Sequence, residues 1–273
     1  MKIKLIAFLI LISIAFQIQA ASIDTILIRS SVMLRQIKCV VILPASYNND
    51  KRCFPVVYLL HGYGGKYSDW ITKVPQLKTY SDKYEFLIVC PDGGSASWYF
   101  DSPVNPNILY ETYIGKEVPE YIDSAYNTIK DRDHRAITGL SMGGHGALFL
   151  AWRHADQYGA AGSISGGLDL KESIHKFEIE KVLGDTTHFM INWEKYCMLN
   201  IAKDKPGSSL KLIIDCGLMD IFIEGNRKIH QILSRSAIPH DYIERAGNHN
   251  WEYWSNAIEY QLLFFSKYFN KHG

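Results

Sequence analysis

Short apolar runs, each bounded by polar or glycine-rich turns, recur along the chain and predict β-strands. They read KCVVILP, FPVVYLLHG, EFLIVCPDGG, HRAITGL, YGAAGSISGG, LKLIIDCG and HDYIERAG. Nearly continuous apolar runs of this length are typical of strands that are buried on both faces of a sheet.

Segments with a helical character separate several of these runs. Helices are predicted over ETYIGKEVPEYIDSAY, over residues 142–154, near GNRKIHQILSRSA and over the C-terminal WEYWSNAIEYQLLFFSKYF. Because strands alternate with helices, the pattern predicts an α/β fold whose mostly parallel central sheet carries helices on both faces.

The least regular region is 168–207, which lies between two predicted strands. It contains Phe177, Phe189, Trp193 and Tyr196 but no clear strand. In an α/β enzyme, an insertion at this place lies over the carboxyl edge of the sheet, where ligands bind. The alternative is a surface excursion that packs its own aromatic side chains.

The N-terminus differs from the rest of the chain. In MKIKLIAFLILISIAFQIQA, two lysines precede an apolar stretch from Leu5 to Phe16, and a small residue follows at Ala20. This layout predicts a signal peptide over 1–20 and a secreted or periplasmic protein with no stable membrane span after cleavage. A retained anchor is the alternative, but the apolar stretch is short for a span. Residues 21–273 are expected to form a single catalytic domain.

Composition narrows the function classes. The chain has 273 residues and a formal net charge of +1, so nothing points to a nucleic-acid partner. It has five cysteines, an odd number, and no CxxC motif or Cys/His cluster. We therefore expect neither a metal site nor a cofactor, and leave any disulfide pairing open.

The segment ITGLSMGGHG contains a G-x-S-x-G pattern, which presents a serine on a tight strand-to-helix turn. Small residues on both sides let the backbone take a strained conformation and let a substrate approach. The helix that follows directs its positive end toward developing negative charge. Ser141 is therefore a candidate nucleophile, whereas His145, inside the following helix, is expected to pack nearby.

A serine hydroxyl needs a base, and the base needs an acid to orient it. In the α/β-hydrolase order, the acid and then the histidine follow the serine, each after a later strand. Asp220 lies in the turn beyond one predicted strand, and we prefer it to Asp215, which falls inside that strand. His249, in AGNHNW, follows the last predicted strand and is the candidate base.

An acyl-transfer site also needs donors for the oxyanion. YLLHGYGG ends a strand with His61 and Gly62, like the HG motif that supplies a backbone N–H in such enzymes. We assign the donors as the backbone N–H groups of Tyr63 and of Met142, the residue after the nucleophile.

These motifs resemble the esterase D-like group of α/β hydrolases, which includes S-formylglutathione hydrolases, carbohydrate esterase family 1, tributyrin esterases and mycolyltransferases. The matching segments are FPVVYLLHGYGG, PDGGSASWYFD, YIGKEVPEYIDSAY, ITGLSMGGHGAL, DCGLMDIFIEGN and GNHNWEYW. The resemblance implies an α/β-hydrolase fold. It also implies a triad on Ser141, Asp220 and His249, with oxyanion donors on Tyr63 and Met142.

Candidate substrate contacts follow from the same comparison. Trp98 and Tyr99 resemble the family segment beside the active site, and packing under a loop is their alternative role. His61, beside the oxyanion loop, and Trp193, in the 168–207 insertion, complete the set of candidates.

Together these features predict a serine carboxylesterase that hydrolyses short-chain or aromatic esters of the acetyl or feruloyl type through an acyl-enzyme on Ser141. The expected substrate is a small-molecule or polysaccharide-linked ester, with plant polysaccharide as one source. Two alternatives remain: an acyltransferase that uses the same triad, and a non-catalytic carbohydrate-binding protein on a hydrolase fold.

Overall fold

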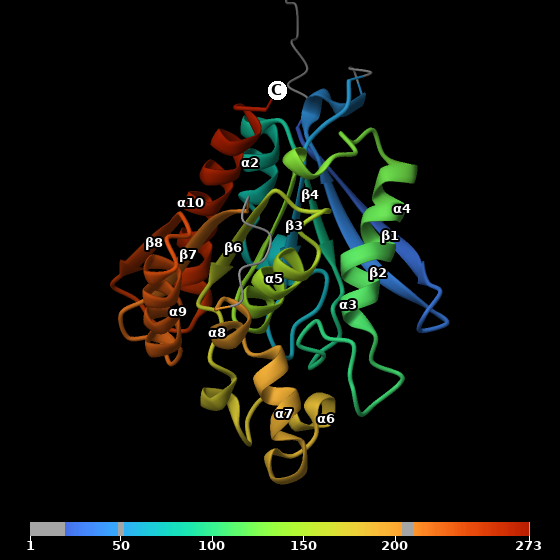
Figure 1. Cartoon of the computed structure of the whole chain (residues 1–273). Helices are drawn as coiled ribbons and strands as arrows, with labels where there is room; N and C mark the ends of the chain where they lie inside the picture. Colours follow the sequence, from blue (N-terminus) through green and yellow to red (C-terminus); the bar gives the residue numbers. More distant parts are fainter. Residues whose placement is uncertain (1–19, 49–51, 204–209, 273) are drawn as a thin grey trace, which may run out of the picture.

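One eight-stranded sheet runs through the residues that the computed structural model describes, which are 20–48, 52–203 and 210–272 (Figure 1). The strands, in chain order, are β1 (Ser22–Ser30), β2 (Arg35–Leu43), β3 (Val56–Leu60), β4 (Leu87–Pro91), β5 (Arg135–Gly139), β6 (Ala160–Ile164), β7 (Lys211–Gly217) and β8 (His240–Arg245). Apart from Ala20, the predicted signal peptide lies outside the described residues and stays a prediction.

The spatial order of the strands is β1-β2-β4-β3-β5-β6-β7-β8. β2 pairs antiparallel with both β1 and β4, and every other neighbouring pair is parallel. The predicted mostly parallel sheet is therefore confirmed. Its parallel strands all direct their carboxyl ends to one edge.

Helices cover both faces of this sheet (Figure 1). They are α1 (Asp69–Lys73), α2 (Leu77–Tyr84), α3 (Tyr110–Thr112), α4 (Val118–Ala125), α5 (Met142–Arg153), α6 (Glu180–Leu183), α7 (Thr186–Tyr196), α8 (Met198–Ile201), α9 (Ile223–Arg235) and α10 (Trp251–Phe269). A π-helical turn, Tyr113–Glu117, joins α3 to α4.

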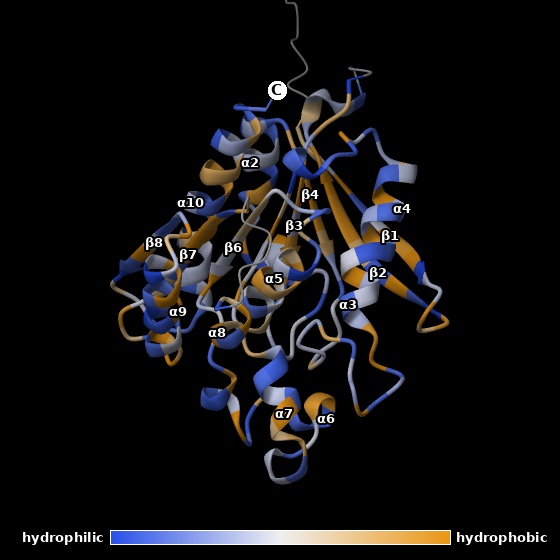
Figure 2. Cartoon of the chain, in the orientation of Figure 1, coloured by the Kyte–Doolittle hydropathy of each residue, from blue (hydrophilic) through white to orange (hydrophobic). Residues whose placement is uncertain are grey.

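Alternate residues of the central strands enter two separate cores. In β3, Val56, Tyr58 and Leu60 pack in the core shared with α4, α5 and α9, whereas Val57 and Leu59 pack against α1, α2 and α10. This two-residue period follows from the pleat of a strand. Figure 2 shows these strands in the hydrophobic colours at the centre of the molecule.

The elements that were not predicted from the sequence include β1, α1 and α2, besides the short helices α6, α7 and α8. β1 stands at the sheet edge and leaves Ile23 and Leu27 exposed at 39% and 50%, so its apolar pattern is incomplete. The helix α1 has only five residues. In α2 only Leu77 and Ser81 are buried, so its sequence contains few of the apolar residues that mark a core-facing helix.

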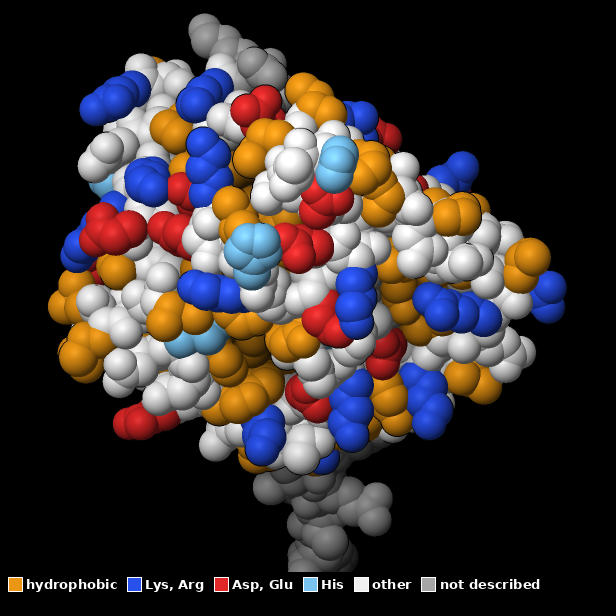
Figure 3. All heavy atoms as spheres, turned by 90° about the horizontal axis from the view of Figure 1, so that it is seen from below, with side chains coloured by type: hydrophobic (Ala, Val, Ile, Leu, Met, Phe, Trp, Pro, Cys, Tyr) orange, Lys and Arg blue, Asp and Glu red, His pale blue; other side chains and the backbone are white. Residues whose placement is uncertain are grey.

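The described part of the region 168–207, which is 168–203, contains short helices, with α6 and α7 lying at the lower end of the molecule in Figure 1. Figure 3 looks at the molecule from below, and on that face acidic and basic side chains are interspersed among hydrophobic ones. Among the described residues, no helix combines the length and apolar character that crossing a bilayer requires.

All five cysteines carry free thiols. Four of them are buried, and Cys53 is exposed. Burial raises the pKa of the thiols of Cys39, Cys90 and Cys216, because a thiolate is poorly solvated in the core.

His145, on α5, is fully buried as expected for a packing residue. Its ring lies 5.3 Å from that of Phe100, 5.8 Å from Trp98 and 6.0 Å from Phe149, measured between ring centroids. Loss of hydration in this aromatic environment lowers the pKa of His145 to about 3. The imidazole is therefore neutral at physiological pH.

This burial predicts a pH dependence of stability. Between the ordinary pKa of 6.5 and about 3, the unfolded chain binds a proton at His145 that the folded chain does not. The free energy of unfolding should therefore decrease as pH falls below about 6.5, by up to about 1.4 kcal/mol per pH unit. Urea unfolding of wild type and His145→Leu at pH 7, 6 and 5 measures this contribution. The free energy of unfolding should decrease less steeply with falling pH in His145→Leu than in wild type. An equal dependence on pH in the two proteins would contradict the lowered pKa of His145.

Candidate active site

Ser141 lies in the turn between β5 and α5, where the chain reverses direction at the carboxyl edge of the sheet. Its backbone has φ 55° and ψ −118°, a conformation that L-residues rarely adopt. The serine N–H donates to the carbonyl of Ile164 at 2.9 Å, which ties the turn to β6. The strained turn therefore presents the Ser141 side chain beyond the end of the strand.

Close backbone packing surrounds this turn. A Cβ atom on Gly143 would lie 2.5 Å from the carbonyl oxygen of His61 and 2.7 Å from that of Leu60. A Cβ on Gly62 would lie 3.4 Å from the Cβ of Ser141. The end of β3 and the first turn of α5 thus meet at a distance that only glycine permits.

The three candidate triad residues are joined by hydrogen bonds. His249 Nε2 lies 2.9 Å from Ser141 Oγ, and His249 Nδ1 lies 3.0 Å from each carboxylate oxygen of Asp220. Since an ionised carboxylate can only accept, Nδ1 carries the proton and Nε2 accepts from the serine hydroxyl. This is the arrangement in which a histidine can remove the serine proton.

Burial and ring packing hold the acid and the base in place. The Asp220 side chain is fully buried, and the N–H of Phe222 donates to its Oδ1 at 2.9 Å. The His249 ring meets the rings of Phe222 and Trp254 edge to face, with centroids 5.2 and 4.9 Å apart. These contacts restrict the imidazole to the plane that joins Asp220 to Ser141.

The loops that carry the acid and the base also bind each other. The N–H of Leu218 donates to the carbonyl of Arg245 at 2.8 Å, and the N–H of Met219 to that of Gly247 at 3.0 Å. A Cβ on Gly217 would lie 2.5 Å from the Gly247 carbonyl oxygen, so this close approach requires glycine.

Asp215, the alternative acid in the sequence, occupies a different position. Its fully buried carboxylate accepts hydrogen bonds from Arg245 Nη2 and from the Tyr253 hydroxyl. Arg245 ends β8, Tyr253 lies in the first turn of α10, and His249 lies between them. Asp215 therefore bridges the two ends of the loop that carries His249.

The backbone N–H groups of Tyr63 and Met142, the two predicted oxyanion donors, have no internal hydrogen-bond partner among the described residues. Met142 is the first residue of α5, so its N–H belongs to the unpaired donors of a helix start. Both groups are available to a developing oxyanion.

A cavity of about 310 Å³ opens in front of Ser141 and His249. Its aromatic lining consists of Tyr63, Phe177, Trp251 and Trp254, and Asp69 contributes a carboxylate. The ring of Phe177, which comes from the 168–207 region, lies 5.5 Å from that of Tyr63. Phe177 and Trp251 were not among the residues singled out as substrate contacts, although both belong to sequence segments noted above.

The four residues predicted to touch substrate lie elsewhere. His61 is 1% exposed, and its ring binds the Gly62 carbonyl and the Gly93 N–H, both at 2.8 Å. Burial lowers the pKa of His61, which keeps the ring neutral for this bridging role. None of the four lines the cavity at Ser141 among the described residues.

Trp98 and Tyr99 pack beneath the site. Trp98 and Tyr99 are 1% and 0% exposed. The Tyr99 hydroxyl donates to the His61 carbonyl at 2.9 Å, and Trp98 Nε1 donates to the Phe177 carbonyl at 3.3 Å. Trp193, at 2% exposed, lines a different cleft. The burial of Trp98 and Tyr99 favours their alternative role, in which they pack under a loop and support the residues that line the cavity.

The fold and the Ser-His-Asp geometry define the class: this is an α/β-hydrolase fold with the arrangement of a serine hydrolase. A family model described as "Putative esterase" matches residues 30–265. The chain therefore belongs to this esterase family, which confirms the predicted ester-hydrolysing enzyme class and the family resemblance.

The individual relatives include esterases and an acyltransferase. The chain is 27% identical to an acetyl esterase of Caldicellulosiruptor saccharolyticus, covering 80% of this chain and 85% of the relative. It is 26% identical to the diacylglycerol acyltransferase/mycolyltransferase Ag85B of Mycobacterium leprae, covering 89% and 83%. A solved ferulic acid esterase superposes with a TM-score of 0.79 at 27% identity, covering 91% of this chain and 99% of that one.

The position of Asp215 yields a testable prediction. Asp215→Asn removes the charge that pairs with the partly buried Arg245, so the free energy of unfolding should fall by about 3 kcal/mol. Because the His249 loop loses the link between its ends, kcat should fall as well. Denaturant unfolding and ester hydrolysis measure the two effects. Asp241→Asn, at an exposed position of β8, is the matched control. Unchanged stability and kcat in Asp215→Asn would contradict the bridging role.

Proposed function

We propose that the protein is a serine carboxylesterase that forms an acyl-enzyme on Ser141. The observation that carries this proposal is the Ser141–His249–Asp220 chain of hydrogen bonds at the mouth of an aromatic cavity. Family membership supports the reaction class. The roles of the individual residues rest on their geometry.

In the first half of the reaction, Ser141 Oγ attacks the ester carbonyl carbon while His249 Nε2 takes the hydroxyl proton. The resulting imidazolium is stabilised by the Asp220 carboxylate. The carbonyl oxygen becomes an oxyanion, which accepts hydrogen bonds from the N–H groups of Tyr63 and Met142. Collapse of the tetrahedral intermediate breaks the carbon–oxygen bond, and His249 protonates the departing alcohol.

In the second half, water replaces the alcohol. His249 Nε2 takes a proton from water, and the hydroxide formed attacks the acyl carbon. The second tetrahedral intermediate releases the carboxylic acid and returns the proton to Ser141 Oγ. No step requires a metal ion or an organic cofactor.

The acyl group that we propose is an aromatic or short-chain one, and plant polysaccharide esters are the proposed natural source. The four aromatic rings around the cavity can contact a planar aryl group. The volume of the cavity, about 310 Å³, suits the acyl part of a small acid. Similarity to an acetyl esterase and to a ferulic acid esterase supports the same range of acyl groups.

An acyltransferase is the second candidate, supported by similarity to a mycolyltransferase. It shares the first half-reaction and passes the acyl group to an alcohol instead of water. Product analysis with a sugar acceptor in excess separates the two: free acid supports the esterase, and an acylated sugar supports the transferase.

We further propose that the protein is exported and acts in the periplasm or outside the cell. This proposal rests on the charged, apolar and small-residue layout of residues 1–20. N-terminal sequencing of the secreted protein tests it, because cleavage after Ala20 or Ala21 leaves a defined new terminus.

The nucleophile is tested by Ser141→Ala. Loss of a triad serine typically lowers kcat by about 10⁶-fold, so hydrolysis of p-nitrophenyl acetate should fall nearly to background. Wild type should be labelled by a fluorophosphonate at Ser141, and the variant should not. Ser95→Ala, at an exposed serine, is the control and should behave as wild type. A variant that keeps most of its activity would show that another residue attacks the ester.

The aromatic cavity is tested by Phe177→Ala. Removing this ring should lower kcat/KM for methyl ferulate by about tenfold, because one aromatic contact is lost, and should change it little for methyl acetate. Phe189→Ala is the matched control, since Phe189 lies on α7 of the same region but does not line the cavity. Equal losses for both esters would mean that Phe177 does not contact the acyl group.

A further inference from the structure

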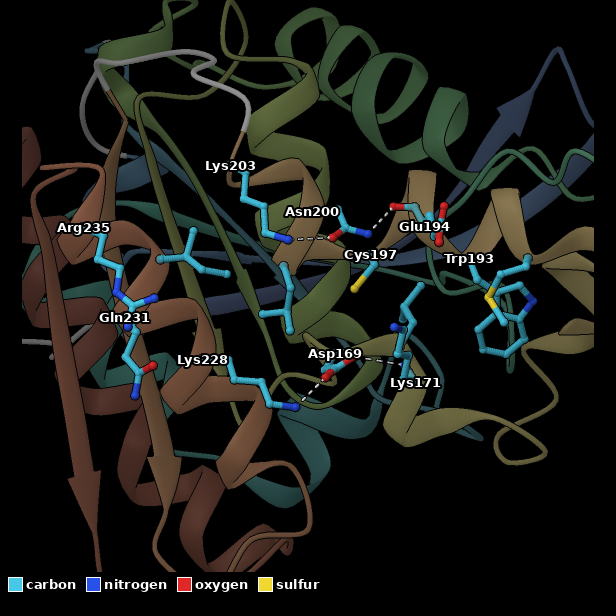
Figure 4. Close-up of a pocket in the computed structure, with 14 residues that line it drawn as sticks. Asp169, Lys171, Trp193, Glu194, Cys197, Asn200, Lys203, Lys228, Gln231 and Arg235 are labelled. Carbon is cyan, nitrogen blue, oxygen red and sulfur yellow. Dashed lines mark hydrogen bonds and ion pairs between the residues drawn. The ribbon is translucent and has the colours of Figure 1, made fainter.

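A second cleft lies beside α9 (Figure 4), and Ser141 is not among the residues that line it. Its volume is about 290 Å³, and its lining shares no residue with the cavity at Ser141. One wall is the face of α9 that carries Lys228, Ile232 and Arg235. The opposite wall comes from α7, α8 and the chain after β6.

Apolar side chains form the floor of this cleft. Leu199, on α8, and Ile232, on α9, are half-buried residues that line the cleft, and Cys197, at 5% exposure, lines it as well. The body of a ligand that rests here therefore displaces water from an apolar surface, which favours a hydrophobic group.

Basic side chains surround that floor, as Figure 4 shows. Four cationic side chains line the cleft against two acidic ones: Lys171, Lys203, Lys228 and Arg235 against Asp169 and Glu194. The chain as a whole has a formal net charge of only +1. The positive charge here is thus a local feature of the cleft.

Two of these cations have neither an ion pair nor a side-chain hydrogen bond within the described part of the chain. Lys228 Nζ pairs with Asp169 at 2.8 Å, and Lys203 Nζ donates to Asn200 at 3.1 Å. By contrast, no ion pair involves Lys171 or Arg235 among residues 20–48, 52–203 and 210–272. An incoming anion can therefore pair with them without displacing an internal partner.

We propose that this cleft binds an amphipathic monocarboxylate. Its apolar body lies on Leu199 and Ile232, and its carboxylate pairs with the basic rim, where the planar guanidinium of Arg235 can hold both oxygens. The proposal rests on the proposed function in one respect: hydrolysis of an aromatic ester releases an acid of this class. The cleft is then a product-binding site separate from the catalytic cavity.

A ligand that matches this cleft must contact both its apolar floor and its basic rim. An inorganic anion would use the basic rim but leave the apolar floor exposed to water. An uncharged aromatic would cover the floor but leave the cations unpaired. A carboxylate with an aryl or alkyl body satisfies both, and the volume of the cleft accommodates a small molecule of this kind.

The test uses the full mature chain with Ser141 blocked by a fluorophosphonate, which removes the catalytic cavity as a binding site. Mass spectrometry confirms the block, and isothermal titration calorimetry then measures binding of sodium ferulate and of its carboxamide. We expect one ferulate site, with the carboxamide at least about tenfold weaker because it lacks the charge.

Matched variants distinguish binding in the cleft from binding to basic residues elsewhere on the surface. Lys171→Gln combined with Arg235→Gln should weaken ferulate binding by about tenfold or more and leave hydrolysis of p-nitrophenyl acetate unchanged. Lys73→Gln combined with Lys267→Gln changes two exposed lysines outside the cleft and should alter neither measurement.

Several results would overturn the proposal. They are the absence of ferulate binding to the blocked protein, equal affinity for the carboxamide, equal affinity in the cleft variant, and full competition by inorganic phosphate. Failure of the proposed function appears separately, as absence of fluorophosphonate labelling or of ester hydrolysis. In that event, ferulate binding to the unblocked chain is compared with binding to the Lys171→Gln/Arg235→Gln variant, which is altered only in the cleft.

Discussion

The left-handed backbone at Ser141 is the constraint on which the rest of the site depends. A non-glycine residue in such a conformation costs of order 1–3 kcal/mol, and the surrounding structure must hold it. The hydrogen bond from Ser141 to Ile164 and the contact of Gly143 with the end of β3 do so. Both depend on the parallel arrangement of β3, β5 and β6, so the position of the nucleophile is a direct consequence of the sheet topology.

The acid and base depend on a second set of contacts at the same edge. Backbone hydrogen bonds join the loops after β7 and β8, and Asp215 holds the two ends of the loop that carries His249. The two aspartates of the DCGLMD segment thus have different tasks. Asp220 meets the imidazole directly, whereas Asp215 acts through the backbone that positions it.

Much of the fold follows from local sequence because the central strands are buried on both faces and therefore appear as apolar runs. The order of Ser141, Asp220 and His249 was predictable for a related reason, since each follows its own strand at the carboxyl edge. Sequence could not predict β1, whose outer residues meet solvent and break the pattern. It could not predict the helix α2 either, because only a small part of its surface is buried.

The cavity lining was harder to predict than the triad. Aromatic residues in a loop segment can point toward a ligand or into the core, and the sequence does not distinguish these orientations. Trp98 and Tyr99 pack inward and take positive φ values of 55° and 62°, whereas Phe177 reaches the cavity from a distant segment. Tertiary contacts determine whether each ring points into the core or toward the cavity, as the hydrogen bond from Tyr99 to the His61 carbonyl illustrates.

The absence of disulfides among the five cysteines bears on the redox conditions in which this protein can fold. Its five thiols are unpaired, and the sheet is held by buried side chains and by hydrogen bonds. Folding to this structure therefore needs no oxidant and no thiol–disulfide isomerase, and a reducing milieu removes no cross-link from it. An enzyme built in this way keeps its fold in reducing surroundings, where proteins that rely on disulfides lose those cross-links.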